Sequence, residues 1–311
     1  MTAITEASFV DLYLGNGYSD VKGLHGATAR RVPTPDGWEA DIAQLRERCM
    51  KHFGANKDPE FSLIEDGVLL RVTQFVDPFG ENVFVLRKSN IEIRDIQLMG
   101  FPNSLLDALL SEAARGLVVI CGDMGVGKTS TAVALLVARL KAHGGIAIAA
   151  EDPQETNVSG VHGQGRCIQM QVSRATGGYE ESLTRALRTG ADMIYVGEIR
   201  DPASAAQIVR ASINGNFIIT TGHGGSISDV IERIASLAEP YISNAREILA
   251  KGLIAVVYQN LENTGNKKVL KIRSLVLTSD DGLSIREKIR SGHIQQIEHD
   301  VENQAKRSLW G

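Results

Sequence analysis

The sequence has few cysteines, and they form no recognisable pair. Cys49, Cys121 and Cys167 are far apart in the chain, and no CxxC spacing occurs. This pattern suggests neither a disulfide framework nor a zinc site, so we expect a reducing compartment. Cys121 lies in an apolar run with no base to activate it, and we expect it to serve packing.

An excess of positive charge is also missing. The 311 residues include 33 Lys and Arg against 37 Asp and Glu, which gives a formal net charge of −4. Aromatic residues make up 5% of the chain, and no run combines them with basic residues. Because nucleic-acid binding normally needs a basic surface, we expect no nucleic-acid partner.

Long hydrophobic runs are absent as well. No apolar run approaches the ~18 residues of a membrane span. The N-terminal stretch MTAITEASFVDLYLG has acids where a signal peptide would have bases. We therefore expect a cytoplasmic protein, which would work at a membrane only by being recruited to it.

The N-terminal third of the chain has the pattern of a small domain. Residues 1–95 contain short apolar alternations such as GVLLRVTQFV, with one helical segment, WEADIAQLRERCMKHF, among them. This pattern predicts a small α+β domain. Residues 96–105, IQLMGFPNSL, contain Gly100 and Pro102, and we interpret them as a hinge or linker.

Residues 106–311 have a different pattern, in which continuous apolar runs alternate with helical segments. Runs such as GLVVICG, GGIAIAAED, ADMIYVGEI and NFIITTGH are too continuous for strands exposed on one face. Strands buried on both faces and joined by helices predict a parallel sheet covered by helices, an α/β fold. We also expect a hairpin turning at Thr264–Asn266 and a helical C-terminal segment.

A glycine-rich stretch in this second domain carries the clearest chemical signal. Residues 121–130, CGDMGVGKTS, satisfy G-x-x-x-x-G-K-[ST] between an apolar strand and a helix. The glycines let successive N–H groups face a phosphate chain, and the helix directs its positive end at it. Lys128 can reach the β and γ oxygens of a nucleoside triphosphate, and the Thr129 hydroxyl can hold Mg²⁺. The candidate nucleotide-binding residues of this P-loop are Gly122, Asp123, Met124, Gly125, Val126, Gly127, Lys128, Thr129 and Ser130.

Polar residues follow three other apolar runs. Glu151 and Asp152 follow GGIAIAA, Glu198 follows MIYVG, and His223 follows NFIITTG. Ligands of open parallel sheets bind at the carboxyl ends of the strands, so these side chains are candidates for metal binding or for activation of water. A histidine in this position can bind a carboxylate or sense a γ-phosphate, and it can equally be an ordinary satisfied polar group.

The order of these motifs resembles the PilT/GspE superfamily of secretion and type IV pilus ATPases. The family's Walker A, Asp box, Walker B and His box correspond to GDMGVGKT (122–129), AEDPQE (150–155), MIYVGEIRD (193–201) and TTGHGG (220–225). The flanking segments LTRALRTGAD and ILAKGLIAVVYQNL fit too. The resemblance covers residues 60 to 300 and implies a RecA-like P-loop NTPase domain, ATP and Mg²⁺ as cofactors, and a PAS-like N-terminal domain.

The resemblance also implies roles for individual residues. Glu151 corresponds to the family's general base and Glu198 to the residue of the Mg²⁺ shell, although the sequence alone does not separate these two roles. Arg71 and Arg87 match the arginines that the N-terminal domain supplies to the phosphates. Arg188 and Arg200 flank the Walker B motif and are candidates to reach a phosphate or a neighbouring subunit.

Two departures from the family pattern bear on function. Gly224 stands where the His box usually has a threonine, which leaves less to position His223. The sequence has no tetracysteine spacing, and we expect neither the zinc module nor the extra N-terminal domain of many assembly ATPases, as in the PilT retraction branch. Residues 284–291, SIREKIRS, match four of eight positions of the PilT retraction motif AIRNLIRE and also read as an ordinary amphipathic helix.

The resemblance implies a homohexameric ATP-hydrolysing motor of a type IV pilus, peripheral at the inner membrane. It would act on a platform protein there, and through that protein on pilin. The activity that we expect is pilus retraction. The nearest alternatives are ATPases that energise pilus assembly, type II or type IV protein secretion, or conjugative transfer. More distant ones are a RecA-like nucleic-acid motor, a regulatory nucleotide-binding module and a small-molecule kinase.

Overall fold

The computed structural model describes residues 3–89, 92–173, 177–265 and 267–308, which form two compact units. Unit 1 comprises Met1–Ile91 with Glu151–Asn157 and Gln171–Gly178. Unit 2 comprises Glu92–Ala150, Val158–Met170 and Tyr179–Gly311. Among the described residues, no helix is long and apolar enough to cross a membrane.

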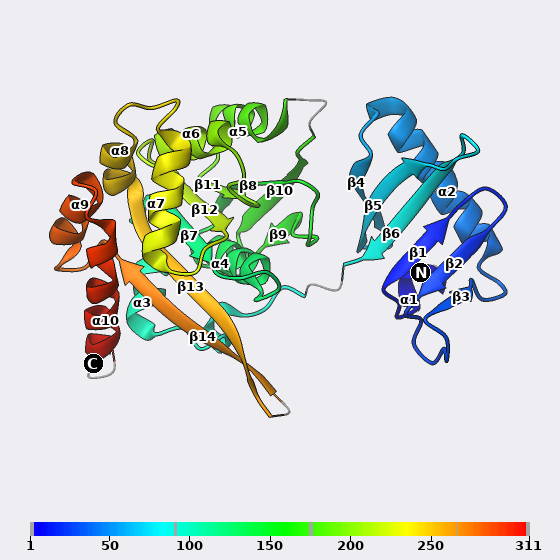
Figure 1. The fold of residues 1–311 in the computed structure, drawn as a ribbon, viewed down its shortest axis with the longest axis horizontal. Helices are drawn as coiled ribbons and strands as arrows, with labels where there is room; N and C mark the ends of the chain where they lie inside the picture. Colours follow the sequence, from blue (N-terminus) through cyan, green and yellow to red (C-terminus); the bar gives the residue numbers. More distant parts are fainter. Residues whose placement is uncertain (1–2, 90–91, 174–176, 266, 309–311) are drawn as a thin grey trace. The chain divides into compact units, whose positions relative to one another are not determined.

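Unit 1 is an antiparallel sheet with two helices, in agreement with the α+β expectation. The strands lie in the order β3-β2-β1-β6-β5-β4 (Figure 1). The elements are α1 (Ala3–Glu6), β1 (Asp11–Leu14), β2 (Ser19–Lys22), β3 (Arg31–Pro33), α2 (Glu39–Asn56), β4 (Glu60–Glu65), β5 (Val68–Val76) and β6 (Asn82–Lys88). The alternating apolar residues of the strands form one buried core with Leu45 and Cys49 of α2.

Unit 2 has an eight-stranded sheet in the order β14-β13-β7-β12-β11-β8-β10-β9. Its central strands, from β13 to β8, are parallel, as the continuous apolar runs predicted. The strands are β7 (Gly116–Cys121), β8 (Gly145–Glu151), β9 (Gly160–His162), β10 (Gly165–Gln171), β11 (Met193–Val196), β12 (Phe217–Gly222), β13 (Leu253–Thr264) and β14 (Lys267–Val276). Every residue of β7 and β12 is buried, because helices cover both faces of the sheet.

The helices of unit 2 connect and cover these strands. They are α3 (Asn103–Leu110), α4 (Lys128–His143), α5 (Gly178–Arg188), α6 (Pro202–Ala211), α7 (Ile227–Ala238), α8 (Ala245–Gly252), α9 (Gly282–Arg290) and α10 (Ile297–Ser308), with short 3₁₀ turns at Ile96–Leu98 and Ile294–Gln296. α4 packs on β7, β11 and β12, while α6 and α7 pack on β7 and β13. The mixed α/β, RecA-like architecture expected from the sequence is therefore the one observed.

Three details differ from, or add to, the sequence analysis. β9 and β10 form an antiparallel extension of the sheet that no apolar run had indicated. Residues 96–105 belong to unit 2, where Ile96, Phe101 and Leu105 join the buried core, so a hinge at this place stays a prediction. The hairpin pairs Thr264 with Lys267 as expected, and Asn266 of its turn lies outside the described residues.

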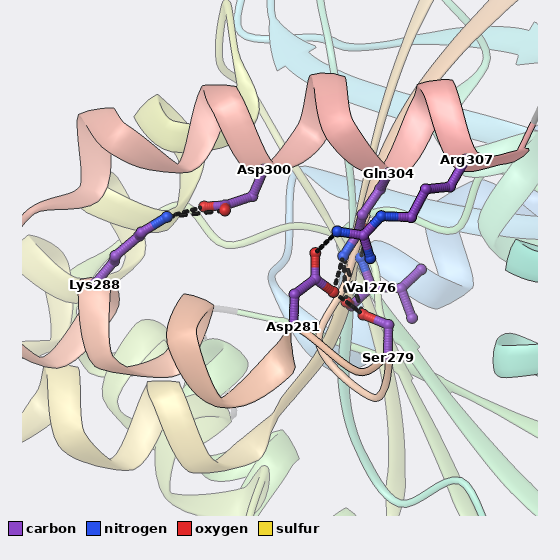
Figure 2. Close-up of polar contacts among 7 residues, drawn as sticks. All are labelled: Val276, Ser279, Asp281, Lys288, Asp300, Gln304 and Arg307. Atoms are coloured by element: carbon purple, nitrogen blue, oxygen red, sulfur yellow. Dashed lines mark hydrogen bonds and ion pairs between the residues drawn. The ribbon is translucent and has the colours of Figure 1, made fainter.

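The C-terminal helices are held to the sheet and to each other by polar contacts (Figure 2). The Lys288 ammonium on α9 lies 2.7 Å from a carboxylate oxygen of Asp300 on α10. The Gln304 amide donates to the Val276 carbonyl at 2.9 Å and accepts from its N–H at 2.8 Å, which continues the hydrogen bonding of the β14 end. Asp281, at the start of α9, accepts from Gln304 at 3.1 Å and pairs with Arg307 at 3.4 Å.

Candidate functional site

The P-loop lies between the end of β7 and the start of α4, where the sequence placed it. Its glycines Gly122, Gly125 and Gly127 have φ values of 142°, 76° and 89°, which residues with a side chain rarely adopt. A Cβ on Gly122 would also lie 2.1 Å from the carbonyl oxygen of Gln259. Glycine is therefore required here both for the backbone angle and for the close approach of a neighbouring strand.

The helix that follows presents its N-terminus to this loop. α4 begins at Lys128, and Gly127, its N-cap, has no side chain with which to cap the first turn. The first N–H groups of any helix have no acceptor within the helix, and the helix dipole adds positive potential there. This end of α4 is therefore suited to bind an anion such as a phosphate.

Lys128 is the buried cation of the loop. Its side chain donates to the carbonyl oxygens of Gly122 at 3.0 Å and Asp123 at 2.7 Å, and the residue is 8% exposed. Its ammonium also lies 3.3 Å from Nδ1 of His223. The cation is thus held inside the loop, where the P-loop motif uses it against phosphate oxygens.

His223 and Glu198 are brought together because their strands are neighbours. β11 and β12 pair in parallel, with Val196 opposite Thr220, and each strand ends just before its polar residue. Nε2 of His223 lies 3.0 Å from Oε1 of Glu198. The structure therefore joins the predicted Walker A lysine, His-box histidine and Walker B glutamate in one chain of polar contacts.

The Walker B segment is fixed by backbone contacts to β12. The hydroxyl of Thr221 donates to the Gly197 carbonyl at 2.6 Å, and the N–H of Ile199 donates to the Thr221 carbonyl at 3.1 Å. Arg200 donates from Nε to Oε2 of Glu198 at 2.8 Å, so one candidate arginine meets this carboxylate. Arg188, the other, is exposed at the last residue of α5.

Glu151 is the last residue of β8, one position beyond the Ala150–Val196 pair with β11. It is 2% exposed, and its carbonyl accepts the N–H of Val172 at 3.0 Å. The segment 151–157 is grouped with unit 1. Within that unit the hydroxyls of Ser62 and Ser89 donate to carbonyls of Gln154 and Glu155, so the Asp-box loop is attached to β4 and to the residue that follows β6.

Arg71 and Arg87 are direct cross-strand neighbours on β5 and β6 of unit 1. Two adjacent guanidinium groups repel each other unless anions compensate them. Arg87 is paired with buried Asp11 at 2.8 Å, and this hydrogen bond raises the pKa of the arginine. Arg71 lies 3.3 Å from a carboxylate oxygen of Glu155 in the Asp-box loop. The pair forms a cationic patch in which both side chains retain partial exposure.

Magnesium would find oxygen donors at this site, namely the hydroxyl of Thr129 and the carboxylate of Glu198. In the part of the chain that the structure describes, no cluster of three or more His, Cys, Asp or Glu could hold a metal on its own. A P-loop site does not need such a cluster, because the nucleotide phosphates and water complete the coordination of Mg²⁺. The donor set fits Mg²⁺ and does not suit a softer metal.

The sequence analysis missed one residue of the site, Gln259 on β13. Its side chain donates to the Val126 carbonyl of the P-loop at 2.7 Å, and the residue is 1% exposed. The signal was present in ILAKGLIAVVYQNL, where an amide follows a run of buried apolar residues. Only the pairing of β13 with β7 brings this glutamine beneath the P-loop.

A model of the type II/IV secretion system protein family matches residues 58–302, most of the chain. The chain belongs to this family, and within it to the PilT/GspE superfamily. The type IV pilus retraction ATPase PilT of Pseudomonas aeruginosa is 32% identical over 300 residues, which cover 92% of this chain and 83% of PilT. The type IV pilus ATPase PilU of the same species is 27% identical over 72% of this chain.

Not every relative is matched along its whole length. This chain spans 59% of PilU and 38% of the type II secretion system protein E of Pectobacterium carotovorum, to which it is 30% identical over 201 residues. Among solved structures, a crystal structure of the pilus retraction motor PilT with bound ADP has a TM-score of 0.75 at 25% identity. The match covers 96% of this chain and 89% of that PilT chain. The Legionella pneumophila ATPase DotB has a TM-score of 0.72 at 15% identity and shares the fold.

Proposed function

We propose that this protein is an ATPase that performs mechanical work for a type IV pilus or a type II/IV secretion machine. The observation that carries the proposal is the polar chain from the P-loop Lys128 through His223 to Glu198. It joins a phosphate-binding cation to a carboxylate that suits a metal shell. The type IV pilus and secretion ATPases among its relatives support the same class of activity.

ATP binding would use this chain's residues in a defined order. The triphosphate would enter between the loop N–H groups and the N-terminus of α4, and Lys128 would exchange the carbonyls of Gly122 and Asp123 for phosphate oxygens. Bound Mg²⁺ would neutralise the charge on the β and γ phosphates. Thr129 would hold the ion, and Glu198 would orient its water shell.

Hydrolysis would then use Glu151 as the base that takes a proton from the attacking water. The charge that develops on the γ-phosphate would be stabilised by Arg71 and Arg87, whose planar guanidinium groups match phosphate oxygens and stay charged. Arg71 would leave Glu155 for the phosphate. Because residues 151–157 are attached to unit 1, a movement of unit 1 would carry the Asp-box loop with it.

Such coupling produces force most simply in a ring, so we propose a homohexamer that acts on an inner-membrane platform protein and, through it, on pilin. Sequential binding and phosphate release around the ring would move its central surface. Within this class we favour pilus retraction, because the PilT alignment spans most of both chains. Secretion is the second candidate, because the secretion protein E relatives match at similar identity.

The first test is phosphate release by the purified protein with ATP and Mg²⁺, measured with its mass in solution over a range of concentrations. We expect turnover that rises as hexamers form and is lost in Lys128→Ala, which should no longer bind ATP. Turnover by a monomer, with no change in mass or rate on concentration, would refute the ring motor. Wild-type protein that neither binds nor hydrolyses ATP would refute the ATPase itself.

The second test separates retraction from assembly and secretion. Surface pili are counted by electron microscopy in a strain lacking the gene and in one complemented with Lys128→Ala. Excess pili with lost surface motility would support retraction. Few or no pili would mean assembly, and unchanged pili with lost secretion would mean the secretion alternative.

A further inference from the structure

Gln259 is a buried glutamine that meets the P-loop in two ways, neither of which involves catalysis directly. Its side-chain amide donates to the carbonyl of Val126 at 2.7 Å. Its backbone carbonyl oxygen lies so close to Gly122 that a Cβ there would be only 2.1 Å away. This one residue of β13 therefore contacts the P-loop at two places, at Gly122 and at the peptide between Val126 and Gly127.

The hydrogen bond fixes the orientation of the side-chain amide. A backbone carbonyl only accepts, so the atom that faces Val126 must be the donating nitrogen. The other end, Oε1, is buried and has no hydrogen-bond partner among the residues that the structure describes. A buried acceptor without a partner is unfavourable. The amide is thus held in this position by its bond to the loop rather than by a fully satisfied environment.

The bond to Val126 also fixes the next N–H group of the loop. In a trans peptide the carbonyl of one residue and the N–H of the next point in opposite directions. Gln259 holds the Val126 carbonyl toward β13, so the N–H of Gly127 points to the opposite side. P-loops bind phosphate with the N–H groups of these residues.

We propose that Gln259 is a positioning residue that orients the Val126–Gly127 peptide for phosphate binding before the nucleotide arrives. Its side chain bonds a carbonyl of the loop, so it should act through the loop on ground state and transition state alike. An interaction of that kind changes nucleotide affinity and KM and leaves kcat nearly unchanged. The inference rests on the proposed nucleotide-binding function and names a residue of that same site.

The first experiment replaces the amide by a side chain of similar size that cannot donate. We expect Gln259→Met to bind a fluorescent ATP analogue about 10-fold more weakly than wild type, with kcat changed by less than about 2-fold. Gln74→Met is the matched control, because Gln74 is also a buried glutamine and donates to Asn82 at 2.7 Å within unit 1. It should bind the analogue as wild type does.

The second experiment introduces a carboxyl group that is a hydrogen-bond donor only at low pH. In Gln259→Glu the introduced carboxyl can donate to the Val126 carbonyl while it is protonated and cannot when it is ionised. Burial raises the pKa of such a carboxyl toward neutrality. We therefore expect affinity close to wild type near pH 5.5 and about 10-fold weaker binding near pH 8.5.

The wild-type protein has the same titratable and charged groups near the loop, so it is the control at each pH. Cys121 and Tyr258 lie beside this stretch, and burial raises the pKa of the thiol to about 12 and that of the phenol above its usual value. Asp123, Lys128 and His223 belong to the loop and its contacts. Each affinity is divided by the wild-type affinity at the same pH, so any pH response that the wild type shares cancels.

The outcomes separate the inference from the function. If wild type binds the analogue, and Gln259→Met and Gln259→Glu bind equally well at every pH, the positioning role is wrong and the ATPase proposal stands. If wild type itself does not bind the analogue, the proposed function fails first. If Gln259→Met does not fold, the pH response of Gln259→Glu decides alone, since a purely structural role predicts no recovery at low pH.

Discussion

The ammonium nitrogen of Lys128 lies 3.3 Å from Nδ1 of His223. An ammonium can only donate, so Nδ1 accepts, and the proton of a neutral imidazole must then be on Nε2. That nitrogen lies 3.0 Å from Glu198, which accepts from it. The histidine is thereby assigned the neutral tautomer that links the P-loop cation to the Walker B carboxylate, and it has this link although Gly224 and Gly225 follow it.

His223→Ala should therefore slow ATP turnover more than it weakens ATP binding. Removing the imidazole leaves Glu198 and Lys128 without a connecting group, and we expect kcat to fall about 10- to 100-fold. His143→Ala is the control, because His143 lies at the far end of α4, where its ring bonds the Leu110 carbonyl. Steady-state kinetics at saturating and limiting ATP measure both effects, and an unchanged kcat would leave His223 as a packing residue.

Glu151→Gln should bind ATP and hardly turn it over. The amide keeps the size of the side chain and cannot accept a proton from water, so we expect kcat to fall at least about 100-fold. Glu198→Gln should instead raise the Mg²⁺ concentration needed for half-maximal turnover, because it removes a charged group of the metal shell. Single-turnover phosphate release with a Mg²⁺ titration distinguishes the two. Near-normal turnover in Glu151→Gln would make Glu198 the better candidate for the base.

Arg71→Ala and Arg87→Ala should each lower kcat more than they raise the dissociation constant for ATP. Both guanidinium groups would stabilise charge that develops only at the γ-phosphate, which is an effect on the transition state. Arg31→Ala is the matched control, because Arg31 pairs with Asp20 on strands of the same unit outside this patch. If both variants turn over ATP as wild type does, the arginines serve only their pairs with Glu155 and Asp11.

Gly224→Thr, which restores the residue usual in the family, should destabilise this protein. A Cβ at Gly224 would lie 2.3 Å from Cγ2 of Val230 on α7, so the Val230 side chain, the helix or the His-box loop must shift. Overpacking of this kind costs about 1–3 kcal/mol. Gly225→Ala is the control, since its Cβ would come no closer than 3.6 Å to Asp229. Thermal unfolding of both variants checks this, and an unchanged melting temperature in Gly224→Thr would contradict it.

The stability of unit 1 should fall as the pH decreases through the range just below 6.5. His52 stacks on Phe61, with ring centroids 4.3 Å apart, and burial lowers its pKa below the usual 6.5. The unfolded chain therefore takes up the proton first, so stability is complete above pH 6.5 and is lost toward the lowered pKa. His52→Gln should flatten this dependence in urea unfolding at several pH values. Replacement of the exposed His25 by Gln should leave it unchanged, and equal slopes in the two variants would refute the assignment.

Helix α9 shows why a short motif match can mislead. The positions of residues 284–291 that match the PilT motif are Ile285, Arg286, Ile289 and Arg290. Both isoleucines are fully buried, Arg286 donates to the carbonyls of Ala250 and Lys251, and Arg290 pairs with Glu247 and Glu287. Each matching residue has a packing or pairing role within unit 2. The match therefore adds no independent support for retraction.

Much of the candidate site could be predicted because its determinants are local. Gly122, Gly125 and Gly127 allow left-handed backbone angles, and the buried run of β7 and the helical pattern of α4 lie on either side of them. The parallel sheet also followed from local pattern, since strands buried on both faces need continuous apolar runs. That Glu198 and His223 follow such runs was enough to place both at strand ends.

The rest depended on contacts between residues far apart in the chain. Local sequence patterns were sufficient to predict the P-loop, the parallel sheet and the acids at its strand ends, because backbone angles and burial period are properties of short segments. Three relationships could be seen only in the folded chain: Arg71 lies opposite Arg87, residues 151–157 attach to unit 1, and Gln259 bonds the P-loop. Strand register and sheet order set these relationships, and they result from the packing of the whole chain.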